Sequence, residues 1–165
     1  LDWLARYLSL TTYEISIPAL RDTSLAPEGK TGLIISILFD YHLTKHIHEN
    51  GWDEDFRDEV AILMIKTLQE TVYPGLNEAI IDKFIATPLT LARRSGNTHG
   101  AITGWSFTNH IMPSENRLIK ITNAVNTHLP NVFQAGQWTY SPSGFPVALI
   151  TGKIAADKVN KQLKK

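Results

Sequence analysis

The sequence predicts an α+β fold in which an antiparallel or mixed sheet packs against helices. Three observations lead to this prediction. Residues 12–18 alternate apolar and polar side chains, as a half-buried strand does. Residues 32–41 are nearly continuously apolar, which is typical of a central strand. Residues 56–68 carry apolar side chains at spacings of three and four, which indicates an amphipathic helix.

The chain begins with helical spacing and continues into the two predicted strands. The first apolar residues that recur at this spacing are Trp3, Leu4, Tyr7 and Leu8. Because the pattern is already under way at the first residues, we expect the chain to be a piece of a longer protein. Residues 21–30, between the strands, contain the Asp, Pro and Gly residues that serve turns. The simplest account is an antiparallel hairpin with a long loop.

A long helix is predicted after the hairpin. Asp53 can cap its N-terminus, because an Asp side chain accepts hydrogen bonds from the first free amides of a helix. Pro74-Gly75 would end it. Its apolar positions are Phe56, Val60, Leu63, Met64, Thr67 and Leu68.

Another strand, a short helix and a loop are predicted next. Residues 80–86 have the composition of a strand, and Thr87-Pro88 would start a helix that continues through Arg94. A loop rich in Ser, Asn and Thr follows, punctuated by Gly96, Gly100 and Gly104. This equal spacing is neither a dinucleotide fingerprint nor a phosphate loop, so by itself it indicates turn chemistry.

The last third of the chain is predicted to run from a strand through a turn into a helix. Residues 132–135 form the strand and residues 139–144 the loop, with Gly136 between them, where the chain bends. Pro146 suits a first helical turn, because its φ is fixed and it lacks an N–H. Residues 147–161 then carry apolar side chains at helical spacing. The helix therefore begins just past the loop.

The first turn of this final helix contains small or apolar side chains and no acid. Its free backbone N–H groups and the positive end of its dipole are therefore available to the negative oxygens of a ligand. Phosphate and the electron-rich edge of a flavin ring both fit this description. The alternative, from spacing alone, is a strand-turn-helix packing unit that binds no ligand.

This segment resembles the closing FAD-binding motif of the flavin-dependent amine oxidase and phytoene desaturase superfamily. The pattern consists of Ala135-Gly136-Gln137, Ser143-Gly144-Phe145-Pro146, Thr151-Gly152 and Ala155-Ala156. Many members carry an acid after the first glycine, whereas this chain has Gln137, whose amide can still hydrogen-bond a phosphate or a hydroxyl. Two earlier stretches also resemble the C-terminal half of phytoene desaturase-related oxidoreductases, namely YEISIPALRDTSLAPEGKTGLIISI and TPLTLARRSGNTHGAITGW.

The resemblance implies the C-terminal fragment of a two-domain FAD-linked reductase-like fold. Residues 1–130 would belong to the substrate domain, and residues 131–165 would complete the FAD-binding domain. Gly136 and Gln137 would approach the ribityl-diphosphate. The residues that would meet the pyrimidine edge of the flavin are Gly144, Phe145, Pro146 and Val147. Such enzymes also hold FAD through a GxGxxG turn, which this sequence lacks, so we expect the isolated chain to be colourless and inactive.

Aromatic residues gather around the two glycine-containing loops. They are Trp105, Phe107, Trp138, Tyr140 and Phe145. Ordinary core packing is one explanation. In the family suggested, the loop that holds Trp138 and Tyr140 would face the flavin, so we expect these two residues and Trp105 to line a hydrophobic substrate pocket. No catalytic residue is assigned, because flavin chemistry resides mainly in the cofactor.

Composition argues against several other classes of function. The 165 residues, 43% of them hydrophobic, allow one sizeable core, and 16 basic residues balance 16 acidic ones, so no global positive field favours nucleic acid. The absence of cysteine excludes disulfides and thiolate metal sites. His42, His46 and His48 lack an HExxH pattern, so we expect a solvated loop rather than a metal site.

The resemblance thus implies that the chain is part of an FAD-dependent oxidoreductase. Hydride would pass between flavin N5 and a carbon of a hydrophobic polyene or isoprenoid-like substrate, as the resemblance implies. The expected partners are FAD and that small molecule, with no nucleic acid. The expected location is cytoplasmic, and peripheral membrane contact of the full-length protein is left open. The alternative function is a non-catalytic ligand-binding or protein-interaction module.

Overall fold

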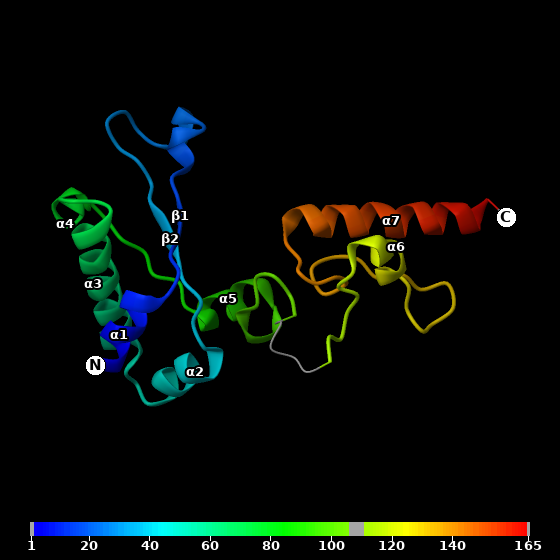
Figure 1. The fold of residues 1–165 in the computed structure, drawn as a ribbon, viewed down its shortest axis with the longest axis horizontal. Coiled ribbons are helices and arrows are strands. Elements are labelled where there is room, and N and C mark those ends of the chain that lie inside the picture. Colours follow the sequence, from blue (N-terminus) through cyan, green and yellow to red (C-terminus); the bar gives the residue numbers. More distant parts are fainter. Residues whose placement is uncertain (1, 106–110, 165) are drawn as a thin grey trace. The chain divides into compact units, whose positions relative to one another are not determined.

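The computed structural model describes residues 2–105 and 111–164 (Figure 1). The chain divides into two compact units, unit 1 (Leu1–Thr90) and unit 2 (Leu91–Lys165). Within the described residues, helices combine with a small antiparallel sheet, which confirms the α+β prediction. The expected domain boundary at residue 130 refers to the domains of a complete oxidoreductase, and it stays a prediction.

The predicted hairpin is present in unit 1. Strand β1 (Glu14–Ser16) pairs with β2 (Ile34–Ser36) in antiparallel register, with Ile15 opposite Ile35. The two strands lie side by side in Figure 1, joined by a long loop that contains the 3-10 turns η1 (Pro18–Leu20) and η2 (Thr23–Leu25). The prediction of a central strand over residues 32–41 is wrong. The strand is only three residues long, and Ile34 is 54% exposed, because the sheet in the described part of the chain has two strands.

The core of unit 1 lies between α1 (Asp2–Leu10) and α3 (Asp53–Thr71). Leu4 and Leu8 of α1 are fully buried, and Leu68 of α3 is 2% exposed. Four-residue spacing places Leu4 and Leu8 on one face of α1, so both bury against the same neighbour. The N-terminal helical pattern is therefore confirmed.

The long helix is confirmed, but its predicted cap is wrong. Asp53 is the first helical residue of α3, and Trp52 occupies the N-cap position without a side-chain hydrogen bond. The Asp53 carboxylate lies 3.5 Å from Arg57 Nη2 and 3.8 Å from His48 Nδ1. An acid in the first turn favours a helix through its dipole, which explains the sequence signal without a cap. Pro74-Gly75 follows the end of α3 and precedes the short helix α4 (Leu76–Ala79).

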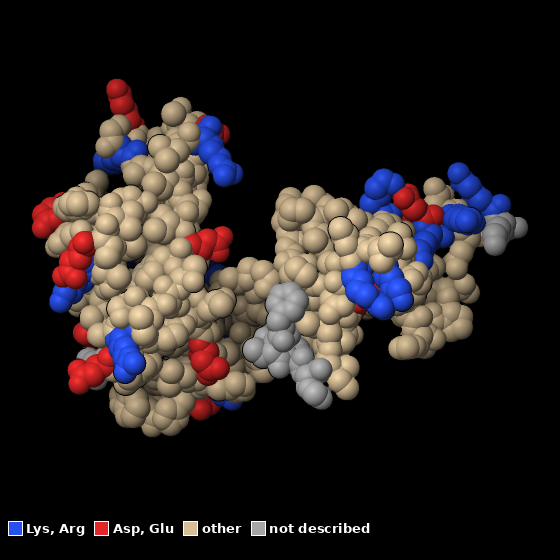
Figure 2. All heavy atoms as spheres, viewed as in Figure 1, with Lys and Arg blue, Asp and Glu red and all other residues tan. Residues whose placement is uncertain are grey.

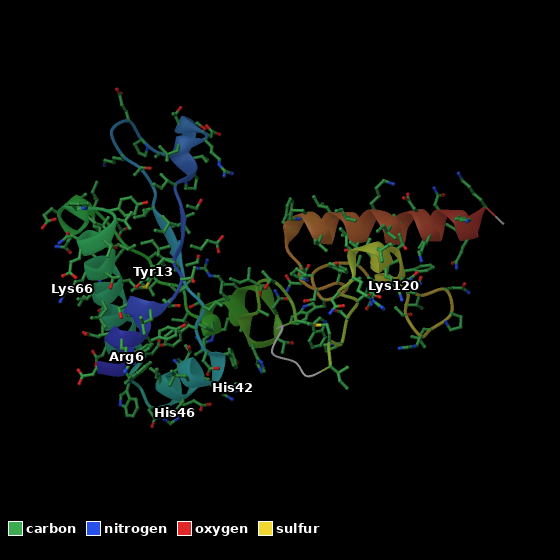
Figure 3. All side chains as sticks on the ribbon, in the orientation of Figure 1. Arg6, Tyr13, His42, His46, Lys66 and Lys120 are labelled. Carbon is green, nitrogen blue, oxygen red and sulfur yellow. The ribbon has the colours of Figure 1, made fainter. Side chains whose placement is uncertain are left out.

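The histidine-rich segment is a helix, and the expected loop is wrong. Helix α2 (Tyr41–Glu49) begins after Asp40, whose Oδ1 accepts a hydrogen bond of 2.7 Å from the Leu43 amide. His42 and His46 both extend from α2 in Figure 3. Among residues 2–105 and 111–164, no group of three or more His, Cys, Asp or Glu side chains is arranged to hold a metal ion.

The predicted strand over residues 80–86 is wrong, whereas the helix after it is confirmed. The segment is irregular, and Ile81 is 76% exposed. A strand requires a neighbouring strand for its backbone hydrogen bonds, and the described sheet consists of β1 and β2 alone. Helix α5 (Pro88–Ser95) starts as predicted, because Thr87 Oγ1 accepts a hydrogen bond of 3.3 Å from the Thr90 amide.

Unit 2 is built around α7 (Phe145–Leu163), which Figure 1 shows beside α6 (Ile121–Ala124). The turns η3 (Thr98–Gly100) and η4 (Leu118–Lys120) precede α6. Val125 and Thr151 are fully buried, which places the core of this unit between the two helices. The start of α7 just past Gly144 confirms the predicted helix.

The predicted strand over residues 132–135 is wrong. Phe133 instead forms an isolated antiparallel bridge with Asn126. The Gln134 amide donates to Val125 O at 2.9 Å, and its side-chain Nε2 donates to Ala124 O, also at 2.9 Å. These bonds tie the segment to the end of α6, so its backbone is satisfied without a continuous strand ladder.

Candidate cofactor-binding site

The N-terminus of α7 is the first component of the candidate site. Gly144 occupies the N-cap position with an extended backbone and has no side chain with which to cap the helix. No acid lies in the first turn, and Pro146 has no N–H to satisfy. The Ala148 amide donates to Gly144 O at 2.9 Å, as the first bond of the helix. The first turn of α7 therefore presents the Phe145 and Val147 amides without a side-chain cap.

The turn that begins at Gly136 is the second component. Gly136 has a φ of +103°, a conformation that strongly favours glycine, and its carbonyl accepts a hydrogen bond of 3.1 Å from the Thr139 amide. The Gly136 N–H donates to Thr151 Oγ1 of α7 at 3.1 Å. The turn and α7, both named in the sequence prediction, are thus connected directly.

Gln137, the second residue of this turn, contacts the preceding glycine-containing loop. Its Nε2 donates to Ala101 O at 3.4 Å. Its backbone carbonyl lies so close to Gly104 that a Cβ at residue 104 would stand 2.3 Å from the oxygen. The 98–104 loop and the Gly136 turn therefore pack backbone to backbone.

Two tryptophans pair beside this contact. Trp105 Nε1 donates to Trp138 O at 2.9 Å, and the two rings meet edge to face with centroids 5.1 Å apart. Both side chains are partly exposed. The structure therefore brings together the two residues proposed as pocket walls, and that role stays a prediction.

Tyr140 is placed differently from the tryptophans. It is 5% exposed, and its hydroxyl donates to Asn116 O at 3.2 Å. The next residue, Ser141, donates its amide to Glu115 O at 3.0 Å. Tyr140 thus belongs to the core of unit 2 beneath the loop, and its predicted contact with substrate is untested. Phe107 lies outside the described residues.

The candidate residues carry almost no ionisable groups. Only Tyr140 among them has an ionisable side chain, so attraction for an anion comes from backbone amides and the dipole of α7. The basic side chains of α7, including Lys158 and Lys161, gather toward its C-terminal half (Figure 2). Nearby, a hydrogen bond from Arg117 holds the pKa of the Glu115 carboxyl below its usual range.

Two surface hollows lie in unit 1, away from these residues in sequence. One of about 450 Å³ runs along α1, where it is lined by Trp3, Tyr7 and Leu10. Another of about 390 Å³ lies between α3 and α4, where Ile62 and Lys66 contribute to its wall. Arg6, beside the first, and Lys66 are labelled in Figure 3.

Sequence reasoning named three further residues of this region but did not predict their contacts. Thr151 and Gly104 contact the Gly136 turn from 15 and 33 positions away along the chain. Ser143, next to Gly144, has a buried Oγ with no hydrogen-bond partner in the part of the chain that the structure describes. The Thr151-Gly152 pair stood within the resemblance, but no local pattern could reveal its contact.

Comparisons with known proteins detect a distant relationship. No family model matches the chain. The chain is 26% identical over 157 residues to 4,4'-diapophytoene desaturase (4,4'-diaponeurosporene-forming) from Staphylococcus aureus strains Newman and USA300. The similarity to the protein of that name from strain bovine RF122 / ET3-1 is also 26%, over 155 residues. The match to the Newman protein covers 92% of this chain. It spans 29% of the relative's length.

This similarity supports a relationship to the diapophytoene desaturases at a distant level. It extends over nearly the whole chain, so both compact units take part in it. The described residues contain no helix long and apolar enough to cross a membrane.

Proposed function

We propose that this chain is the C-terminal portion of an FAD-dependent oxidoreductase that acts on a hydrophobic polyene or isoprenoid-like substrate. The observation that carries the proposal is the uncapped first turn of α7 beside the Gly136 turn. The distant similarity to diapophytoene desaturases supports the substrate class. In this proposal, residues 131–165 complete an FAD-binding domain, and residues 1–130 belong to the substrate domain.

The described residues fit a flat, partly anionic cofactor in three respects. A Cβ at Gly136 would meet no atom within 4 Å, so a ligand has room to approach the backbone there. At Gly144, a Cβ would come within 4.0 Å of Pro146 Cδ alone. The Ser143 hydroxyl is buried without a partner among the described residues, and such a group usually has one.

Each part of the site has a distinct role. The Phe145 and Val147 amides stabilise negative charge on the pyrimidine edge of the ring, as preorganised dipoles do. Gly136 and Gln137 approach the ribityl-diphosphate. The Trp105, Trp138 and Tyr140 side chains shape an apolar wall that excludes water. FAD, when bound, would supply the hydride-transfer chemistry between flavin N5 and a substrate carbon, and these residues would supply binding and orientation.

The alternative is a non-catalytic interaction module, and one observation favours it. Apolar side chains at the start of α7 are exposed, with Phe145 at 78%, Leu149 at 59% and Ile150 at 48%. Exposed apolar patches mark protein or ligand contact surfaces. In the oxidoreductase the same patch would be covered by the rest of the protein. A measurement of FAD binding distinguishes the two functions, because only the oxidoreductase would bind FAD.

The test is to purify the full-length protein and the chain of 165 residues side by side and record their visible spectra. We expect near-stoichiometric FAD in the full-length protein and a colourless short chain, because the chain contains no GxGxxG turn. A full-length protein that takes up no FAD would support the interaction module instead. The cytoplasmic location and any peripheral membrane contact remain predictions for that protein.

A further inference from the structure

We infer that Thr151 is a positioning residue that fixes the Gly136 turn relative to the first turn of α7. The inference rests on the proposed function, because these two segments would hold different parts of one FAD molecule. Nothing in the sequence pattern assigns this role to Thr151. The structure does so through one buried hydroxyl that joins them.

The geometry of the hydroxyl is specific. Thr151 is fully buried in α7. Its Oγ1 accepts a hydrogen bond of 3.1 Å from the Gly136 N–H, and it lies 2.9 Å from Val147 O, to which it can donate its proton. An alternative acceptor is Ala148 O at 3.0 Å. The hydroxyl therefore uses both its donor and its acceptor capacity.

This bond restrains the Gly136 N–H, in addition to the hydrogen bond that the Gly136 carbonyl accepts from the Thr139 amide. A Cβ at this residue would meet nothing within 4 Å, so side-chain packing does not hold the turn at this point. Gly136 also has a positive φ, in a region where glycine is conformationally free. The Gly136 N–H is therefore held by a directional hydrogen bond to Thr151 Oγ1 and not by side-chain packing.

The Thr151 hydroxyl also contacts the first turn of α7. Val147, whose carbonyl lies 2.9 Å from Thr151 Oγ1 and can accept its proton, is one of the two residues whose amides would meet the flavin. One side chain thus links the backbone of the diphosphate-facing turn to the backbone of the ring-facing turn. A ligand that contacts both needs them at a fixed spacing, and preorganised spacing raises affinity.

The experiment compares Thr151→Val with Thr151→Ser in the full-length protein. Valine keeps the shape of threonine but cannot accept the Gly136 hydrogen bond, whereas serine retains the hydroxyl. The first readout is hydrogen exchange of the Gly136 amide, resolved to the single residue by mass spectrometry. We expect exchange about tenfold faster in Thr151→Val and little changed in Thr151→Ser, since one net hydrogen bond corresponds to roughly a tenfold factor.

The second readout is FAD affinity. We expect the FAD dissociation constant to rise about tenfold in Thr151→Val and to stay within about twofold in Thr151→Ser. A control for general destabilisation is Val125→Ala, which removes buried methyl groups from the same unit without touching the turn. It should lower the melting temperature while leaving FAD affinity within about twofold.

The outcomes separate the two claims. Unchanged Gly136 exchange in Thr151→Val would overturn the inference. Faster exchange with unchanged FAD affinity would also overturn it, because the bond would then serve folding alone. A parent protein that binds no FAD would overturn the proposed function together with the positioning role. Affinity that falls in Thr151→Val but not in Thr151→Ser or Val125→Ala supports both.

Discussion

Gly104 and the backbone carbonyl of Gln137 are in direct contact, so closely that any side chain at residue 104 would collide with that oxygen. A Cβ there would stand 2.3 Å from Gln137 O, and the φ of +81° already disfavours other residues. The contact joins the 98–104 loop to the turn of the candidate site. The glycine is therefore required by the packing of unit 2 as well as by its own dihedral angle.

Gly104→Ala should destabilise unit 2 by more than strain alone. The matched control is Gly96→Ala, because Gly96 also has a positive φ, +71°, but nothing lies within 4 Å of its Cβ position. Positive-φ strain costs about 1–3 kcal/mol at either site, and the clash should add about 1–3 kcal/mol at residue 104. Urea unfolding of both variants measures the difference. Equal losses of stability would show that the contact does not exist.

The Trp105 indole should stabilise unit 2 through its hydrogen bond to Trp138 O. Trp105→Phe keeps an aromatic ring but loses the Nε1 donor, and we expect it to lower the free energy of unfolding by about 1 kcal/mol more than its control. The control is Trp138→Phe, which removes the other indole of the pair but leaves the accepting backbone carbonyl in place. Denaturant titration of both variants checks this. A larger loss in Trp138→Phe would contradict the assigned bond.

Glu115 should titrate below the usual range for glutamate. Arg117 Nε lies 3.1 Å from Glu115 Oε1, and the Arg117 amide donates to the same oxygen at 3.0 Å. Both bonds favour the carboxylate and lower its pKa. A lowered pKa in the folded state means stability that is present above the unfolded pKa and is lost as pH falls through the folded pKa.

NMR titration of the side-chain carboxyl tests this prediction. Arg117→Met should move the Glu115 pKa back toward its ordinary value, because it removes the guanidinium, although the backbone bond remains. A Glu115 pKa that does not respond to Arg117→Met would rule out the side-chain bond as the main cause.

Local signals account for the features that the sequence predicted correctly. Helix α5 follows from Thr87-Pro88, and α7 follows from a glycine, a proline and regular apolar spacing. Each of these signals acts within one or two turns of the chain. Helix α2 carried a local signal of the same kind, the Asp40 cap, but the prediction placed Asp40 inside the strand over residues 32–41.

The two wrong strand predictions share a different physical origin. Residues 80–86 and 132–135 have strand-like composition, but a strand forms only where another strand supplies its hydrogen bonds. The amino-acid composition of a segment does not show whether a neighbouring strand is present. The same limit applies to the site, because the contacts from Thr151 and Gly104 to the turn join residues that are distant in sequence.

The central claim is that the uncapped N-terminus of α7 meets FAD, and Gly144→Val tests it most directly. The backbone of Gly144 is extended, and a Cβ there would contact only Pro146 Cδ, at 4.0 Å, so a side chain can start at this residue without a backbone clash. Gly152→Ala, in the middle of α7, is the control, since its Cβ would meet nothing within 4 Å. FAD titration of the full-length variants should show affinity reduced by about tenfold or more in Gly144→Val alone. Affinity equal to that of the parent in Gly144→Val would contradict the account.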